Sequence, residues 1–429
     1  MFQQSSQHVD SYYAHSCADI LRDRPVLEGE QNADVVIIGA GFSGLHTALR
    51  LALAGKRVTV LEASRVAWAA SGRNGGQAIL GWSCDMPPLE AALGHERAKR
   101  LWDGMRWASE ELRELPGRHG FDCDYRPGHL WTSVMPRRVS LLTEWQREAS
   151  HKWGHDDLQF IPREQLSEWV ASDRYQAGLY DPHGAHLNPL KLALGLAAAI
   201  EQAGGRIYEQ SKALSYSREG AGFRVVTERG SVRADVLVLA CNAYLDELDP
   251  QLSSCILPVG TYQVATAPLT SEQVCALLPS NVCVTDNQFV LDYFRRTPDN
   301  RLLFGGGCTY LGGMPRDIGA ATRPFLQRVF PQLKGVEVEF AWGGHIDLTL
   351  KRTPDVGCEG NRYWLQGYSG HGVLPTLAAA LAVSDAILGN TDELTLYQGL
   401  SNGRFPGGKH FAAPLEAIGK AWYRLRDSI

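Results

Sequence analysis

The stretch ADVVIIGAGFSG, residues 33–44, decides the fold of this 429-residue chain. An apolar strand runs into a glycine-rich turn, the turn opens a helix of small and apolar residues, and a second strand ends at Glu62. In this context Gly39 allows a tight turn, Gly41 lets the backbone approach a pyrophosphate, and Gly44 lets helix and strand pack closely. The N–H groups of the first helical turn would face the phosphates. Because Glu62 can accept hydrogen bonds from a ribose diol, we predict a site for an adenine dinucleotide.

The composition is that of a soluble globular protein with two domains. Hydrophobic residues make up 44% and charged residues 21% of the chain, and the net charge of −5 gives no reason to expect a nucleic-acid partner. Nine cysteines are scattered without a C-x-x-C pair, as expected in a reducing compartment. The sequence shows no signal-peptide pattern and no apolar run long enough for a bilayer. We expect a cytoplasmic protein without an integral membrane segment, either a monomer or a small homo-oligomer.

Changes in the hydrophobic pattern predict a discontinuous two-domain organisation. Three strands between residues 212 and 240 read as a β-meander, and residues 235–240 are apolar on both faces, as in a parallel sheet. Residues 255–340 read mostly as antiparallel strands with one inserted helix. We predict an N-terminal arm at 1–32, a dinucleotide-binding domain made of 33–115, 176–250 and 343–400, a substrate-binding domain made of 116–175 and 251–342, and a C-terminal tail with a helix at 401–429.

Two further glycine-rich segments have no helical or strand period. Residues 63–77 follow Glu62 directly, and a long segment without structure of its own is often functional. Residues 367–372 follow an apolar strand and open a helix, so a second helix N-terminus would point at the same ligand. Elsewhere, we expect one amphipathic helix at 91–115 and two strands around a turn at Pro127-Gly128.

Taken together, these motifs resemble a known family. The turn at Gly39, Glu62, the loop ASGRNGGQ at 70–77, LACNAY at 239–244 and GYSGHG at 367–372 occur in that order. They resemble the FAD-dependent amine oxidases of the D-amino-acid oxidase and glycine oxidase superfamily, over nearly the whole chain. The resemblance implies an α/β fold (α+β overall), with a Rossmann-like FAD-binding domain of parallel sheet and β-meander and an antiparallel-sheet substrate domain.

The resemblance also implies FAD, with its pyrophosphate on the first helix and its isoalloxazine ring between the domains. The loop at 71–77 would wrap the cofactor, and the turn at 370–372 would place backbone donors at the flavin pyrimidine edge, where they stabilise negative charge. Sarcosine-oxidase relatives attach FAD through a cysteine just before a Thr-Pro-Asp sequence. Here a leucine stands at that place before Thr353-Pro354-Asp355, so we predict non-covalent FAD. The predicted cofactor-binding residues are Gly39, Ala40, Gly41, Phe42, Ser43, Gly44, Glu62, Ala63, Ser71, Arg73, Asn74, Gly75, Gly76, Gln77, Ala240, Asn242, Gly370, His371 and Gly372.

The implied chemistry is oxidation of a small-molecule amine at the carbon that carries it, with oxygen as the electron acceptor. No catalytic residue is assigned. Aromatic residues near the domain interface are candidates for the substrate wall, and each is equally a candidate for the core. Arg295 could bind a substrate carboxylate or form a surface salt bridge. The candidate wall residues are Tyr262, Tyr293, Arg295, Trp342 and Tyr368.

Two other functions remain open at this point. One is a flavin dehydrogenase for a secondary amine or amino acid that passes electrons to an acceptor other than oxygen. The other is an FAD-binding protein without redox turnover.

A metal site is not expected. Asp181, His183 and His186 stand close together in the sequence, but they lie in a segment rich in proline and glycine. For the pair of histidines, no third ligand has a spacing that suits zinc.

Overall fold

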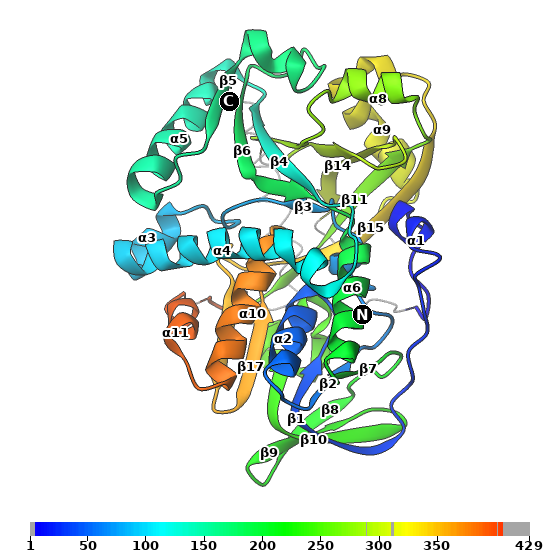
Figure 1. Cartoon of the computed structure of the whole chain (residues 1–429), viewed down its shortest axis with the longest axis vertical. Coiled ribbons are helices and arrows are strands. Elements are labelled where there is room, and N and C mark those ends of the chain that lie inside the picture. The colour runs from blue at the N-terminus through cyan, green and yellow to red at the C-terminus, as the bar shows by residue number, and fades with distance from the viewer. Residues whose placement is uncertain (1–4, 289, 310–312, 401, 406–429) are drawn as a thin grey trace.

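The computed structural model describes residues 5–288, 290–309, 313–400 and 402–405, which form two sheets with helices around and between them (Figure 1). The first sheet has eight strands in the order β16-β17-β10-β1-β2-β7, and β9 and β8 extend it beside β10. The strands from β17 to β7 run parallel, whereas β16 and the meander pair antiparallel. Their bounds are β1 (Gly29–Ile38), β2 (Val58–Leu61), β7 (Arg206–Tyr208), β8 (Ser215–Glu219), β9 (Gly222–Val226), β10 (Gly230–Leu239), β16 (Asp355–Glu359) and β17 (Arg362–Gln366).

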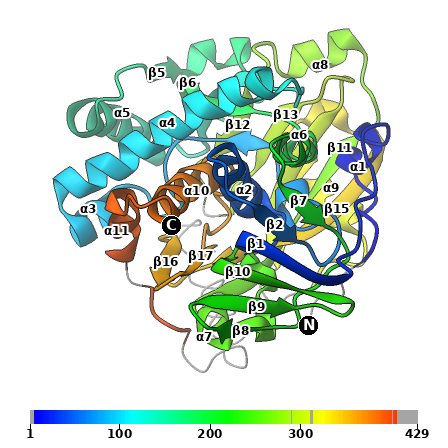
Figure 2. The ribbon, with the colours of Figure 1, turned by 60° about the horizontal axis from the view of Figure 1, so that its bottom comes forward.

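Both faces of the first sheet are covered, which explains why the second half of β1, residues 35–38, is apolar without interruption. Helices α2 (Phe42–Leu53), α6 (Pro189–Gln202) and α10 (Val373–Ile387) lie on one face, and β8, β9 and α7 (Pro250–Ser253) lie on the other (Figure 2). Val35 and Ile37 pack toward the helices, whereas Val36 and Ile38 pack toward the meander. The strand therefore stands in the middle of the core that carries the glycine-rich turn.

The second sheet has nine strands in the order β15-β11-β14-β13-β12-β4-β6-β3, with β5 paired to β6. It is antiparallel, as predicted, except for one parallel pair, β4 with β12. Apolar alternation marks a strand but does not encode the direction of its partner. The bounds are β3 (Gln77–Ala78), β4 (Arg126–Ser133), β5 (Gln159–Pro162), β6 (Ala177–His186), β11 (Leu257–Thr266), β12 (Cys283–Asp286), β13 (Tyr293–Arg296), β14 (Leu302–Thr309) and β15 (Val338–Leu348).

The strand pairing differs from three details of the expected organisation. β6 belongs to the second sheet, although residues 176–250 were assigned to the dinucleotide-binding domain. β15 runs through the expected boundary at 342–343 without a break. Pro127 and Gly128 lie inside β4, where the pairing with β6 shifts register, so they form an irregularity in one strand and not a turn. All three differences have one cause: contacts between segments distant in sequence decide which strands pair, and a local sequence pattern does not record them.

Helix α4 (His95–His119) crosses the middle of the molecule and contacts α6 and α10 of the first layer and β6 of the second sheet (Figure 1). The helix expected at 91–115 is two helices that meet at Gly94, whose φ of +78° ends the first one. Among the described residues, no helix is both long and apolar enough to cross a membrane. The remaining helices are α1 (Tyr12–Ser16), α3 (Pro87–Leu93), α5 (Val139–Trp153), α8 (Ser271–Leu277), α9 (Ile318–Val329) and α11 (Asp392–Gln398).

The N-terminal arm is ordered by its two tyrosines, which are buried in α1. The rings of Tyr13 and Trp342 lie 5.3 Å apart, edge to face, so the arm packs against the second sheet. The arm is shorter than expected, because residues 29–32 already belong to β1. The helix predicted in the C-terminal tail lies outside the described residues.

Candidate cofactor and active site

The glycine-rich turn between β1 and α2 has the steric constraints that the sequence predicted. Gly39 has a φ of +106°, and a Cβ there would lie 2.5 Å from the carbonyl oxygen of Ala240 on the neighbouring strand. A Cβ on Gly44 would lie 2.0 Å from the carbonyl oxygen of Gly39. A Cβ on Gly41 would lie 3.0 Å from Ser71 Oγ. Only glycine therefore allows this turn to be as tight as it is.

The first turn of α2 is not capped by its own N-cap residue, which is Gly41. The backbone N–H of Phe42 instead donates to Ser71 Oγ at 2.9 Å, and the hydroxyl of Ser43 donates to the hydroxyl of Tyr368 at 2.9 Å. The loop after β2 and the turn before α10 thus both meet the positive end of α2. Such an end stabilises an anion through its N–H groups and its dipole, so this junction fits a pyrophosphate.

Glu62 follows β2 and turns back toward the glycine-rich turn. Its Oε2 accepts from the N–H of Ala40 at 2.8 Å and its Oε1 accepts from the N–H of Ser64 at 2.9 Å. Burial raises the pKa of Glu62 to about 7, although these two N–H groups favour the ionised form. The carboxyl group is therefore held next to the dinucleotide turn by two backbone donors.

The loop at 71–77 is folded by Asn74. Its Nδ2 donates to the carbonyls of Ala70 at 3.0 Å and Ser71 at 3.1 Å, and its Oδ1 accepts from the N–H of Gly76 at 2.8 Å. Both ends of the amide are used within the loop, and a contact of this side chain with flavin stays a prediction. The amide shapes the loop, and the backbone is left to face a ligand.

Side chains of the second sheet donate hydrogen bonds to backbone carbonyl groups of the loop at 71–77. The indole Nε1 of Trp342 donates to the carbonyl of Arg73 at 3.0 Å, and Gln263 Nε2 donates to the same oxygen. Arg295 Nε donates to the carbonyl of Gly75 at 2.8 Å. Gln77, the last residue of the loop, donates from Nε2 to two carbonyls of β12 and β13, each at 3.2 Å. The position of the predicted FAD loop is thus set by residues far away in sequence.

Arg73 is buried and only partly satisfied. Its Nε donates to the carbonyl of Trp68 at 2.6 Å, its Nη1 donates to the carbonyl of Gly343 at 3.1 Å, and the guanidinium lies 4.0 Å from the Trp68 ring centroid. Its Nη2 is buried and has no hydrogen-bond partner among the described residues. Burial lowers the pKa of Arg73. A buried donor without a partner is unusual and fits an acceptor atom of a bound cofactor.

The turn at 368–372 brings the N-terminus of α10 next to that of α2. Ser369 and Gly370 both have positive φ, +53° and +85°, which reverses the chain before the helix begins. His371 donates from Nε2 to the carbonyl of Ile79 at 2.9 Å, and burial lowers the pKa of this neutral imidazole. The side chain of His371 is therefore structural, and the backbone N–H groups of the turn are what the fold presents.

The end of β10 completes this region. Ala240 continues the pairing of β10 with β1 through its N–H, which donates to the carbonyl of Ile38 at 2.8 Å. Asn242 has a φ of +52°, and its Oδ1 is buried without a hydrogen-bond partner among the residues described. Asp347 lies close by: burial raises its pKa to about 6, and hydrogen bonds from the Gly367 N–H and from Asn242 oppose that rise.

Most of the predicted substrate-wall residues are core residues. Trp342 is 2% exposed, Tyr368 6% and Tyr262 8%. Arg295 is 1% exposed, and besides Gly75 it donates to the hydroxyl of Tyr13 at 3.1 Å and to the carbonyl of Arg296 at 3.2 Å. Arg295 is too buried to form a surface salt bridge, and its carboxylate-binding role stays a prediction. Its charge was visible in the sequence, but its burial was not.

Tyr293 is the one predicted wall residue that stays half-buried. Its ring lies between two glycines, since a Cβ on Gly75 would be 2.6 Å and a Cβ on Gly305 2.0 Å from ring atoms. The ring thus lies directly over the predicted FAD loop. Of the five candidates, Tyr293 has the position that best suits contact with a ligand at that loop.

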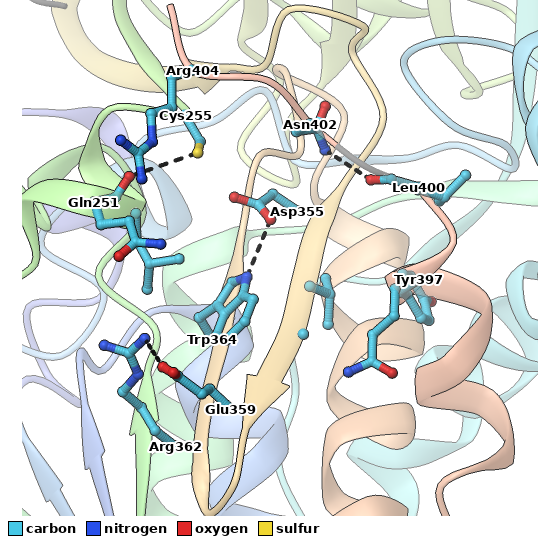
Figure 3. A pocket seen from close by; sticks show the side chains of 14 residues that line it. Gln251, Cys255, Asp355, Glu359, Arg362, Trp364, Tyr397, Leu400, Asn402 and Arg404 are labelled. Carbon is cyan, nitrogen blue, oxygen red and sulfur yellow. Dashed lines mark hydrogen bonds and ion pairs between the residues drawn. The ribbon is translucent and has the colours of Figure 1, made fainter.

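A cavity of about 420 Å³ lies elsewhere, beside the edge strand β16 and helix α11 (Figure 3). Asp355 at its wall accepts from the indole Nε1 of Trp364 at 3.1 Å, and Arg362 donates to Glu359 at 2.7 Å. None of the predicted cofactor or substrate-wall residues lines this cavity. It is therefore separate from the site at the glycine-rich turn.

Comparison with known proteins identifies the family. Residues 34–386 match the family model of DAO, FAD dependent oxidoreductase. The chain belongs to this family. Gamma-glutamylputrescine oxidoreductase of Escherichia coli (strain K12) is 39% identical over 426 residues, 99% of each chain, and the probable oxidoreductase OrdL of Haemophilus influenzae is 35% identical over 98% of each.

The fold of this DAO-family oxidoreductase agrees with solved structures. Glycine oxidase from Geobacillus kaustophilus superimposes with a TM-score of 0.69 at 22% identity, over 83% of this chain and 95% of that one. The predicted two-domain fold class is thereby confirmed, and FAD is the cofactor. The glycine cradle, the partnerless Nη2 of Arg73 and the two converging helix N-termini fit that cofactor.

Sequence reasoning missed several residues that build the site. Gln263 holds the loop, and Trp68 stacks on Arg73. Tyr13 anchors Arg295, and Asp347 accepts a hydrogen bond from Asn242. No local motif marks any of them. The one sequence feature that indicates close packing here is a glycine opposite a large side chain, such as Gly305 beneath Tyr293.

We predict that Gly44→Ala purifies with little bound FAD, because its Cβ would collide with the Gly39 carbonyl and push α2 away from the turn. The ratio of flavin to protein absorbance measures this. Gly104→Ala is the matched control, since a Cβ at that helical position meets nothing within 4 Å. Full occupancy in Gly44→Ala would show that the turn tolerates a side chain.

A second prediction concerns pH. If the Glu62 carboxylate accepts from the ribose, FAD binding favours its ionised form, whose fraction falls as the pH drops through about 7. The affinity of the flavin-free protein for FAD should then be higher at pH 8 than at pH 6, by at most about tenfold for one ionisation. Flavin fluorescence quenching gives the dissociation constant. Glu62→Gln should flatten this dependence, and Glu62→Ala should purify depleted of FAD. An unchanged pH dependence in Glu62→Gln would exclude Glu62 as its source.

A third prediction separates anchoring of the loop by Arg295 from binding of a substrate carboxylate. Arg295→Lys should lower FAD occupancy and thermal stability, because lysine cannot reach Gly75, Tyr13 and Arg296 together, and each lost bond to a charged group costs about 1.5–3 kcal/mol. Per bound flavin, amines with and without a carboxylate should lose kcat/KM equally. Arg296→Lys is the control, since its Nη1 donates to the Leu278 carbonyl, away from the loop. A selective loss for carboxylate-bearing amines, at full FAD content, would restore the substrate-binding role.

Proposed function

We propose that this protein uses oxygen and water to oxidise gamma-glutamylputrescine, or a related glutamylated polyamine, to an aldehyde, with release of ammonia and of hydrogen peroxide from the reduced oxygen. The observation that carries the proposal is the 39% sequence identity, over 99% of this chain, to an enzyme named for that substrate. Such similarity supports FAD-dependent oxidoreduction of an amine. The fold alone does not choose the substrate, because one fold serves many reactions.

FAD supplies the two-electron acceptor for the C–H bond next to the amine nitrogen, and hydrolysis of the resulting imine gives the aldehyde and ammonia. The chain holds the dinucleotide through the N-terminus of α2 and Glu62, and it orients the loop at 71–77 through Trp342 and Arg295. The aromatic ring of Tyr293 over that loop supplies an apolar contact. An apolar surface disfavours the ammonium form, so it helps the substrate amine to lose its proton before oxidation.

We also propose that FAD is bound without a covalent link. Leu348, the last residue of β15, has no group that could bond a flavin. The nine cysteines are free thiols, and none precedes the Thr-Pro-Asp sequence at the distance seen in sarcosine-oxidase relatives. Non-covalent attachment remains a prediction.

Steady-state peroxide formation by the FAD-loaded enzyme tests the substrate. Gamma-glutamylputrescine should have a kcat/KM well above those of free putrescine and sarcosine, because only it offers the glutamyl group. Equal or faster turnover of sarcosine or free putrescine would exclude the proposed substrate. Anaerobic bleaching of the flavin by the same amines without peroxide formation in air would instead indicate a dehydrogenase with another acceptor, and no bleaching by any of them would indicate a protein without redox turnover.

A further inference from the structure

Two histidines and two aspartates meet where the segment after α5 passes β6. His155 and Asp157 lie between α5 and β5, whereas Asp181 and His183 lie on β6. One ring nitrogen of each histidine and one carboxylate oxygen of Asp157 lie within 4.8 Å of one another. These groups are part of neither the FAD site nor the cavity of Figure 3. They bring together the ligand types that divalent transition metals prefer.

Asp181 contacts one ring nitrogen of His155 and so orients this imidazole as a metal ligand. The imidazole is 1% exposed, and its Nε2 lies 3.2 Å from Asp181 Oδ2. Its Nδ1 is buried and has no hydrogen-bond partner among the described residues. If Nε2 carries the proton that Asp181 accepts, Nδ1 presents a free lone pair. Metal-binding histidines commonly donate their other N–H to a carboxylate in this way.

His183 and Asp157 face each other at the solvent side of the cluster. His183 Nε2 lies 2.7 Å from Asp157 Oδ2, and the N–H of His183 donates to Asp181 Oδ1 at 2.9 Å. Asp181 therefore holds both histidines, one through its ring and one through its backbone. The side chain of Asp157 is exposed, so it can move to admit an ion.

We propose that His155, Asp157 and His183 bind one divalent cation of the zinc type, with Asp181 orienting the histidines and water completing the coordination. Zinc bonds of about 2.0–2.2 Å place tetrahedral ligand atoms roughly 3–4 Å apart. The His183–Asp157 spacing of 2.7 Å is shorter than that range, and the upper bound of 4.8 Å for the three atoms is longer. Movement of the exposed Asp157 side chain can adjust its own distances to both histidines. Two carboxylates offset the charge of the dication. One cation stands nearby: Arg106, which donates to the Gly154 carbonyl at 2.8 Å.

The sequence expectation of no metal site rested on ligand spacing along one segment. His186, which that spacing included, turns elsewhere and its Nε2 contacts the carbonyl of Asn281 at 2.9 Å. The other two ligands, His155 and Asp157, come instead from the segment between α5 and β5, and Asp157 lies 26 residues upstream of His183. A bound ion would tie that segment to β6, whose C-terminal end, just beyond His183, pairs with β3 at Gln77 in the FAD loop.

The test uses the full-length, FAD-loaded protein after treatment with a chelator. Zinc sulfate should bind at one ion per chain by elemental analysis, and cobalt chloride should give the visible absorption of a low-coordinate Co²⁺ site. Asp157→Asn and His183→Gln should each weaken zinc affinity at least tenfold, and Asp181→Asn should weaken it by about 10–100-fold. His151→Ala, on the exposed last turn of α5, is the matched control and should bind as the wild type does.

Zinc should also raise the melting temperature of the wild type and of His151→Ala but not of Asp157→Asn, because only a bound ion stabilises the native state. Asp157→Asn keeps the test decisive even if the His183 variant folds poorly, since the Asp157 side chain is on the surface. Absence of stoichiometric zinc binding by the wild type would overturn the proposal. Wild-type affinity in Asp157→Asn would overturn it as well.

Discussion

The carbonyl groups of the loop at 71–77 are satisfied by side chains of the second sheet, and the site depends on this interaction. Trp342 and Gln263 both donate to the carbonyl of residue 73, and Arg295 donates to that of Gly75. A loop between two domains cannot leave such groups buried and unpaired without a cost of about 1–3 kcal/mol for each. The loop therefore takes its shape from the sheet, and the sheet is joined to the cofactor layer through the loop.

The same interaction explains why charged and aromatic residues at the interface are a poor guide to substrate contacts. Arg295 is anchored between Gly75 and Tyr13 of the N-terminal arm, so its charge serves to fasten the arm and the loop to β13. Tyr368 accepts from Ser43 at the start of α2 and links the two helix N-termini. Tyr293 alone among the candidates keeps a half-buried ring over the loop.

Strand β6 connects regions that the sequence had separated. One end pairs with β3 directly after the FAD loop, its middle carries Asp181 and His183, and its other end pairs with β5. It pairs along its length with β4. A constraint placed on β6, whether by packing or by an ion at His183, therefore acts on the sheet that holds the loop. This gives the proposed metal site a structural role.

The sequence by itself determined the dinucleotide end of the site. Gly39, Gly44 and Glu62 could be recognised because their roles depend on steric and hydrogen-bond demands within one strand–turn–helix–strand unit. The unbroken apolar run from Val35 to Ile38 reflects a strand with both faces covered. Only the tertiary structure decided that β6 joins the second sheet, that Arg295 is buried, and that His155 and Asp157 meet His183. These features depend on which distant strands and segments pack together, and pairing between segments far apart in the chain leaves no pattern in the residues on either side.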